Sequence, residues 1–225
     1  DWCSGYHASD STVIGFSHTH LSGTGIGDLF DVTLMPVIGE VTYARGVESD
    51  PTSGMWSYAD RTKEVARPGY YSVDLQEENI KAELTATPRV GVHRYTYPAG
   101  AARRVRLDMD HSAVKGSWGR QIINAQIRQV GPNAVEGYRV ITGWAKLRKV
   151  YFYAEFSEPI ESIDLSDGGR HEKGADVING RELRAMIDFA KSDKPLEIKV
   201  GISGVSCENA KENLEAETAG KNFDM

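Results

Sequence analysis

The densest group of chemically versatile side chains lies near the start of the chain, between Ile14 and Asp28. Together with Gly5–His7, this segment holds three of the six histidines and five of the 23 glycines. Histidine rings and small hydroxyl groups supply hydrogen-bond donors and acceptors. Glycines let the backbone approach a ligand closely. This composition is typical of a binding loop that a rigid sheet holds in place.

Three interpretations of this segment stay open. In the first, it is a structural loop whose histidines are satisfied by hydrogen bonds. In the second it forms a metal site, because His18 and His20 would place two rings on one face of a strand, with Asp28 as a third ligand. Only a pair is visible, so we assign no metal ligand. In the third it lines a substrate site, with these candidate contacts: His18, His20, Ser22, Gly23 and Thr24.

Trp2 comes just before this segment and joins the candidate substrate contacts. An indole ring beside a polar cleft can stack on the apolar C–H face of a sugar, while the N–H edge of the indole remains hydrated. We interpret the remaining tryptophans, Trp56, Trp118 and Trp144, as residues that pack in the core.

Composition limits the classes of partner. The chain has 225 residues and a net charge of −6, from 26 basic and 32 acidic residues, so it is a poor candidate for a general nucleic-acid binder, which needs a basic face for phosphate contacts. We interpret its most basic cluster, Arg103, Arg104 and Arg106, as a solvated strand edge. No stretch approaches about 18 consecutive apolar residues, so no membrane-spanning helix is expected. Whether Cys3 and Cys207 pair stays open.

The elements that must position the segment are β-strands. Half-buried antiparallel strands alternate apolar and polar residues, and two sheets packed face to face hide both apolar faces. A hairpin is expected from 123–130 and 134–142, around the turn residues 131–133. The sequence thus predicts an all-β fold, a two-sheet antiparallel β-sandwich. Six further segments alternate in this way: 71–76, 80–85, 104–109, 150–156, 183–189 and 196–202.

One short helix is predicted at the C-terminal end, from Ser206 to Ala219. Ser206 can cap its first turn, Glu208 complements the positive helix start, and Gly220 can end it. We therefore expect a β-sandwich domain over residues 1–205 and a linker helix in 206–225.

Three stretches closely resemble glycoside hydrolase family 92: Asp1–His7, Gly15–Gly25 and the tail from Val200 through Ala210. Members of that family are exo-acting α-mannosidases, largely bacterial. The resemblance implies a supersandwich-like N-terminal domain, followed through the linker helix by a larger (α/α)6 catalytic domain that is absent from this chain.

The resemblance also implies a calcium-dependent, inverting reaction on mannose-containing glycans. Both the catalytic carboxyl groups and the calcium would belong to the absent domain, so we expect no catalytic residue and no cofactor in this chain, and no activity from it alone. The context of Trp2 resembles members that act on α-1,2 linkages. The expected partners are the glycan and the missing domain, and the expected location is periplasmic or extracellular.

Two other functions remain as alternatives. One is a free-standing carbohydrate-binding or adhesion β-sandwich, and the other is a small metal-dependent enzyme built on His18 and His20. Under the mannosidase interpretation, Trp2 and the loop from His18 to Thr24 should lie, partly exposed, on the side where the terminal helix leaves.

Overall fold

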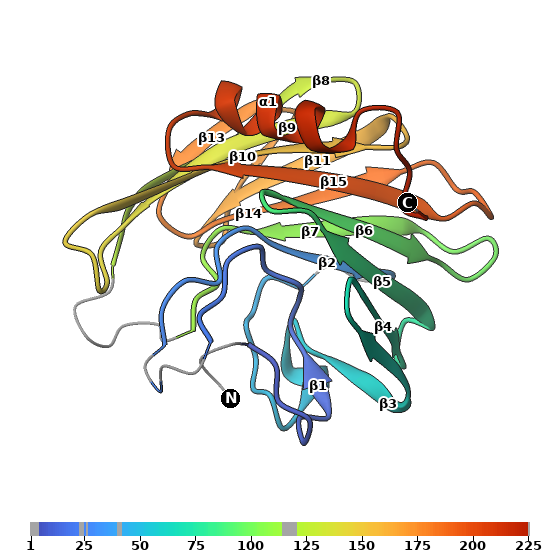
Figure 1. Cartoon of the computed structure of the whole chain (residues 1–225). Coiled ribbons are helices and arrows are strands. Elements are labelled where there is room, and N and C mark those ends of the chain that lie inside the picture. The colour runs from blue at the N-terminus through green and yellow to red at the C-terminus, as the bar shows by residue number, and fades with distance from the viewer. Residues whose placement is uncertain (1–4, 23–24, 26, 40–41, 114–120, 225) are drawn as a thin grey trace.

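The computed structural model describes residues 5–22, 25, 27–39, 42–113 and 121–224. Two antiparallel sheets pack face to face, as the sequence predicts (Figure 1). The larger sheet has ten strands in the order β1 (Thr12–Val13), β3 (Ser57–Arg67), β4 (Tyr70–Leu75), β5 (Ile80–Ala86), β6 (Val90–Thr96), β15 (Leu196–Ser203), β10 (Arg148–Phe156), β9 (Ala134–Ile141), β8 (Ile122–Gly131) and β13 (Val177–Gly180).

The smaller sheet has five strands in the order β12 (Arg170–Lys173), β11 (Ile160–Asp167), β14 (Leu183–Phe189), β7 (Arg103–Asp108) and β2 (Thr33–Val37). A short 3-10 helix, η2 (Pro51–Ser53), precedes β3. The predicted all-β sandwich and its hairpin around residues 131–133 are confirmed.

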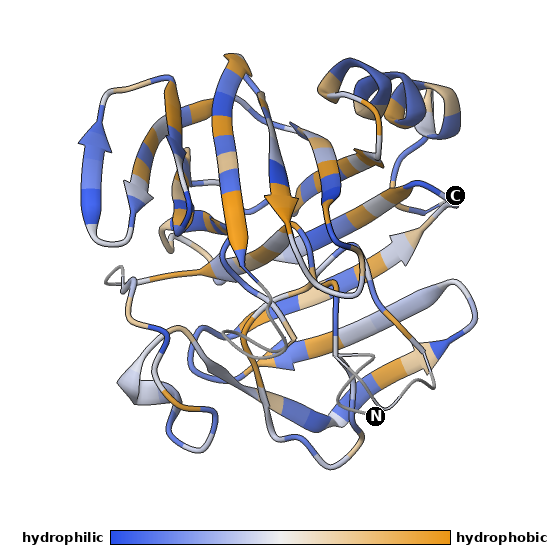
Figure 2. Ribbon diagram, turned by 90° about the vertical axis from the view of Figure 1, so that its left-hand side faces the viewer, coloured by the Kyte–Doolittle hydropathy of each residue, from blue (hydrophilic) through white to orange (hydrophobic). Residues whose placement is uncertain are grey.

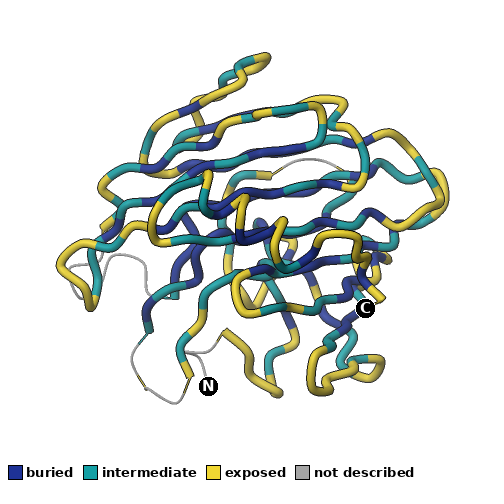
Figure 3. Tube along the Cα trace, turned by 45° about the horizontal axis from the view of Figure 1, so that its top comes forward, coloured by how far each residue is buried: buried dark blue, intermediate teal, exposed yellow. Residues whose placement is uncertain are grey.

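The core lies between the sheets because the alternating strands turn their apolar faces inward. Hydropathy alternates residue by residue along the strands (Figure 2), and the buried positions form bands along both sheets (Figure 3). Phe152 of the large sheet and Leu107 and Ile187 of the small sheet are among its fully buried members. Burial of each such side chain contributes roughly 1.5–3 kcal/mol, so the sandwich is a stable frame for its loops.

The arginines of β7 do not form a solvated edge, so that interpretation was wrong. β7 pairs with β14 on one side and β2 on the other. Arg103 and Arg106 are only 1% and 3% exposed. Arg103 donates to Glu158 at 2.6 Å, and Arg106 donates to the carbonyls of Ile14 and Met55 at 2.7 and 3.0 Å. The acceptors come from segments that are distant in the sequence, so a local pattern does not reveal them. These hydrogen bonds make burial of the two charges possible.

The predicted helix is confirmed as α1 (Cys207–Thr218). The Ser206 hydroxyl accepts from the backbone N–H of Asn209 at 3.0 Å, as an N-cap does. The helix lies on the outer face of the large sheet (Figure 1). It packs closely on β15 at Gly201, where a Cβ would stand 2.2 Å from the Ala210 carbonyl oxygen.

The tryptophans depart from the predicted core packing. Trp144 is 57% exposed in the turn between β9 and β10, so its interpretation as a core residue was wrong. Trp56 is half-buried and lines a cavity, whereas Trp118 lies outside the described residues. Cys3 lies outside them too, so its pairing with Cys207 stays untested. Within the described residues, no helix is both long and apolar enough to span a bilayer.

Candidate functional site

The predicted binding segment folds back on itself as a two-limbed strap, which we define as residues 16–34. Its limbs are joined by backbone hydrogen bonds: Phe16 N–H to Leu34 O at 2.8 Å, His18 N–H to Asp31 O at 3.0 Å, and Phe30 N–H to Thr19 O at 2.9 Å. The second limb continues into β2. The sandwich therefore holds both ends of the strap.

The returning limb has an unusual backbone. Leu29, Phe30 and Val32 have φ angles of 71°, 63° and 54°, in the left-handed region that favours glycine. A non-glycine residue there costs of order 1–3 kcal/mol and persists only where surrounding contacts enforce it. Such strain clusters at functional sites, and nothing in the local sequence predicts it.

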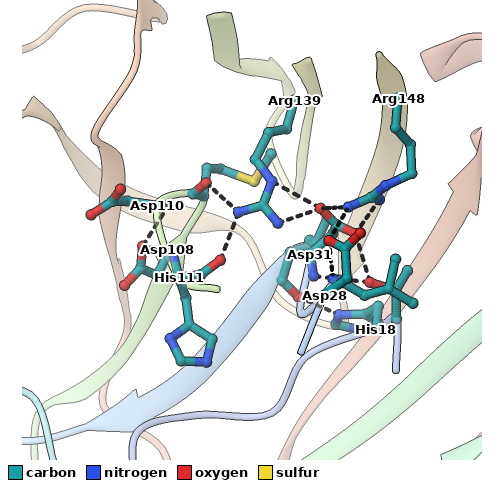
Figure 4. Close-up of polar contacts among 12 residues, drawn as sticks. His18, Asp28, Asp31, Asp108, Asp110, His111, Arg139 and Arg148 are labelled. Carbon is teal, nitrogen blue, oxygen red and sulfur yellow. Dashed lines mark hydrogen bonds and ion pairs between the residues drawn. The ribbon is translucent and has the colours of Figure 1, made fainter. Parts of the chain in front are cut away.

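A buried ionic network enforces this conformation (Figure 4). Asp31 and Arg139 are both fully buried, and the Arg139 guanidinium donates twice to Asp31 Oδ1. Arg148 donates to Asp31 Oδ2 at 2.5 Å, and the Thr19 hydroxyl does so at 2.7 Å. Burial alone would raise the pKa of Asp31, but the charges of Arg139 and Arg148 outweigh it and hold that pKa below its usual range.

The same arginines tie the strap to other parts of the sandwich. Arg139 also donates to the backbone carbonyls of Met109 and His111, at 2.8 and 2.7 Å (Figure 4). Asp28 faces Arg148 at 3.7 Å and accepts from the backbone N–H of Trp144 at 3.2 Å. The strap, the segment after β7 and the β9–β10 turn are therefore fixed relative to one another.

His18 belongs to a second network. Its Nδ1 contacts the carbonyl oxygen of Val32 at 2.5 Å, and its Nε2 lies 2.9 Å from Nε2 of His93. The Nδ1 of His93 lies 2.8 Å from the Tyr95 hydroxyl. These partners assign the tautomers: Tyr95 donates to His93, His93 donates to His18, and His18 donates to Val32.

Both histidines of this network are neutral. Burial lowers the pKa of His18 to about 4 and holds that of His93 well below its ordinary value. The His18 ring rests against Gly91, where a Cβ would stand only 2.6 Å from Cδ2 of the ring. Strand β6 thus positions the His18 ring, because Gly91 leaves room for the ring and His93 bonds to it.

Two adjoining cavities flank the strap. The first, of about 610 Å³, is lined by His18 and His93 and by Thr87 and Arg89. The second has about 580 Å³. Both share a wall that includes Phe16, Ser17, His20 and Tyr71. The strap is thus the partition between two hollows, each within the usual size range of small-molecule sites.

The end of α1 contacts two residues that line the first cavity, Thr87 and Arg89. Glu217 accepts from the backbone N–H of Arg89 at 3.0 Å and from the Thr87 hydroxyl. His18 thus lines a cavity whose wall the terminal helix supports from outside, through Thr87 and Arg89. His20 is exposed, with its Nε2 at 2.8 Å from the Ser17 hydroxyl.

The predicted contacts are thus only partly brought together. Ser22 is exposed and lines neither cavity. Trp2, Gly23 and Thr24 lie outside the described residues. The metal arrangement is not formed: His18 bonds His93, His20 bonds Ser17, and Asp28 faces Arg148. In the described part of the chain, no three His, Cys, Asp or Glu side chains gather as a metal site would require.

Sequence reasoning missed the residues that hold the strap. Asp31, Arg139, Arg148, His93 and Tyr95 come from distant parts of the chain. One signal was present: Arg139 occupies an inward position of the alternating segment 134–141, where an apolar residue is expected. A charge at such a position indicates a buried partner.

Comparisons with known proteins agree with this fold. Residues 1–203 match the Glycosyl hydrolase family 92 N-terminal domain. The structure of the family GH92 α-mannosidase BT3965 from Bacteroides thetaiotaomicron, in complex with mannoimidazole, superposes with a TM-score of 0.91 at 32% identity. That match covers 99% of this chain and 30% of that one.

Two more distant structures show the fold alone. The gh92 family glycosyl hydrolase ccman5 matches with a TM-score of 0.84 at 24% identity, over 98% of this chain and 30% of that one. The inverting mannosidase BT2199 from Bacteroides thetaiotaomicron matches with a TM-score of 0.78 at 22% identity, over 97% and 28%. No curated protein matches the chain. The chain spans about 30% of the length of these structures, and it belongs to glycosyl hydrolase family 92, as an N-terminal domain of that family.

Proposed function

We propose that this chain is the non-catalytic N-terminal domain of an inverting, calcium-dependent exo-α-mannosidase, and that the strap forms one wall of its mannose pocket. The observation that carries the proposal is the match to BT3965, an α-mannosidase whose structure holds mannoimidazole. The proposed substrate is a mannose-containing glycan, with preference for α-1,2 linkages, and the proposed location is periplasmic or extracellular.

The chemistry of the described residues supports a non-catalytic role for this domain. Inverting hydrolysis needs a carboxylic acid and a carboxylate about 6.5–9.5 Å apart, with the acid kept protonated. The strap's two carboxylates, Asp28 and Asp31, face arginines instead, and Asp31 is held ionised. The acid and the base are therefore proposed to lie in the catalytic domain.

The described residues do not fit a calcium site either. Calcium takes six to eight oxygen ligands, several of them carboxylates. Around the strap the carboxylates are already neutralised by Arg139 and Arg148. Calcium would therefore be bound by the rest of the enzyme, and no role of this chain depends on it.

The proposed task of the strap is to present donors and acceptors to a sugar in a fixed geometry. Preorganised groups lose little conformational entropy when a ligand binds. The proposed substrate contacts are Trp2, His18, His20, Ser22, Gly23 and Thr24. His18 is neutral and both of its ring nitrogens are held, by Val32 and His93, so its proposed contribution is contact of the ring with the sugar and not proton transfer.

The test is mannose release by the full-length enzyme from α-1,2-, α-1,3- and α-1,6-linked mannobiose, with and without a chelator. We expect the fastest release from the α-1,2 isomer and loss of activity with the chelator. The 225-residue chain alone should release no mannose. Mannose release by this chain, free of contaminating enzyme, would contradict the proposal, and a native protein that ends with this domain would favour a free-standing carbohydrate-binding module.

A further inference from the structure

The second cavity has features that the mannose pocket does not require. It lies on the side of the strap where Trp56, Arg45 and His111 line its wall, together with Tyr6 and Tyr71. Its volume of about 580 Å³ is ample for a small ligand. Aromatic walls with a few polar groups are the usual composition of a ligand site.

Arg45 has unused hydrogen-bonding capacity in this cavity. It is half-buried, its Nη1 lies 3.3 Å from Nδ1 of His111, and its guanidinium lies 5.9 Å from the centre of the Trp56 ring. No described Asp or Glu forms an ion pair with it. Arg61, on the same cavity wall, contrasts with it: Arg61 donates to Glu64, to the Tyr71 hydroxyl and to the Asp10 carbonyl. Within the described residues, four of the five N–H groups of Arg45 have no hydrogen-bond partner, so they can donate to a ligand.

One further donor belongs to the same wall. Trp56 lines the cavity with its ring, because its indole Nε1 is buried out of reach of a ligand and has no hydrogen-bond partner within the described residues. His111 stacks on Phe30, with ring centres 5.7 Å apart, and burial lowers its pKa to about 3. Because its Nδ1 accepts from Arg45, the neutral ring carries its proton on Nε2, as a donor.

We propose that this cavity is a binding site for a hexuronate, an acidic sugar whose carboxylate is held by Arg45 and by the Nε2–H of His111. Arginine suits a carboxylate because its planar N–H groups match two oxygens at once. Asp10 and Glu48 also line the cavity, and their carboxylates would accept from the sugar hydroxyls. This combination favours a sugar ring bearing one carboxylate over a bare anion. The site goes beyond the proposed mannose contacts, and its test does not depend on turnover.

The experiment is calorimetric titration of the full-length protein with D-glucuronate, and with D-glucose as the neutral counterpart. We expect saturable binding of glucuronate that weakens with added salt. Arg45→Met should weaken it at least about tenfold, and Arg45→Lys less, because lysine keeps the charge and loses the planar donors.

The matched control is Arg170→Met, which removes an exposed arginine on β12 and should leave glucuronate binding unchanged. Circular dichroism and thermal melting confirm that each variant is folded, and Arg45→Lys keeps the test valid if Arg45→Met is unstable. Absence of saturable glucuronate binding would overturn the proposal. So would equal binding by Arg45→Met and wild type.

Discussion

Replacing Asp31 with asparagine removes the charge that Arg139 and Arg148 face in the buried network. The side chain keeps its size, so the change tests the ion pair and not the packing. Asp31 and Arg139 are both fully buried. Removing one partner of such a pair costs about 3–5 kcal/mol, because the other charge stays buried without compensation. Arg139 keeps its bonds to the carbonyls of Met109 and His111, so we expect Asp31→Asn to cost about 3 kcal/mol, the lower end of that range.

The same variant has a signature in the pH dependence of stability. The pKa of Asp31 is lower in the folded protein than in the unfolded chain, where it is about 3.9. The unfolded state therefore binds the proton first, and the stability from Asp31 is complete above pH 4 and lost as the pH falls below it. The wild type should lose about 1.4 kcal/mol per pH unit from this group in that window. Asp31→Asn should lack that contribution.

The measurement is urea denaturation of the 225-residue chain at several pH values, followed by circular dichroism. The matched control is Glu172→Gln, which breaks the exposed pair between Glu172 and Arg170 and should cost at most about 1 kcal/mol. If Asp31→Asn costs no more than Glu172→Gln, or shows the same loss of stability below pH 4 as the wild type, the network does not hold the strap as argued.

Three further results are expected. Gly91→Ala places a Cβ 2.6 Å from the His18 ring, so it should destabilise the chain by about 1–3 kcal/mol in denaturant melts and raise the KM of the full-length enzyme for mannobiose. His18 titrates near pH 6.5 when unfolded and near pH 4 when folded, so it contributes stability that falls as the pH drops between these values; His18→Gln should flatten that part of the stability profile. Ser206→Ala removes the cap of α1 and should cost about 1 kcal/mol of unfolding free energy, whereas an unchanged melting curve would exclude capping by this hydroxyl.

The strands could be predicted because their signal is local. Four alternate side chains of β10 lie on the same face of the sheet and are buried: Val150, Phe152, Ala154 and Phe156. A strand of a half-buried sheet carries this alternation in its own residues, so no knowledge of its neighbours is needed. The same holds for α1, whose cap and packing residues lie within a few positions of one another.

The support of the strap could not be predicted, because its parts are distant in the chain. Asp31 and Arg139 are separated by 108 positions, and His18 and His93 by 75. The arginines of β7 show how a local interpretation fails: the alternation places Arg103 and Arg106 correctly in a strand, but their acceptors belong to segments far from β7 in the sequence.

The buried charges and the strained backbone of the strap have the same physical explanation. A buried ion pair adds little net stability compared with apolar residues of the same volume, and left-handed φ angles at Leu29, Phe30 and Val32 are themselves costly. Directed hydrogen bonds, however, fix an orientation, which apolar contacts do not. Asp31 accepts from three side chains on both of its oxygens, so it sets the position of the returning limb. We infer that the domain gives up folding stability here to hold the partition between its two cavities in one conformation.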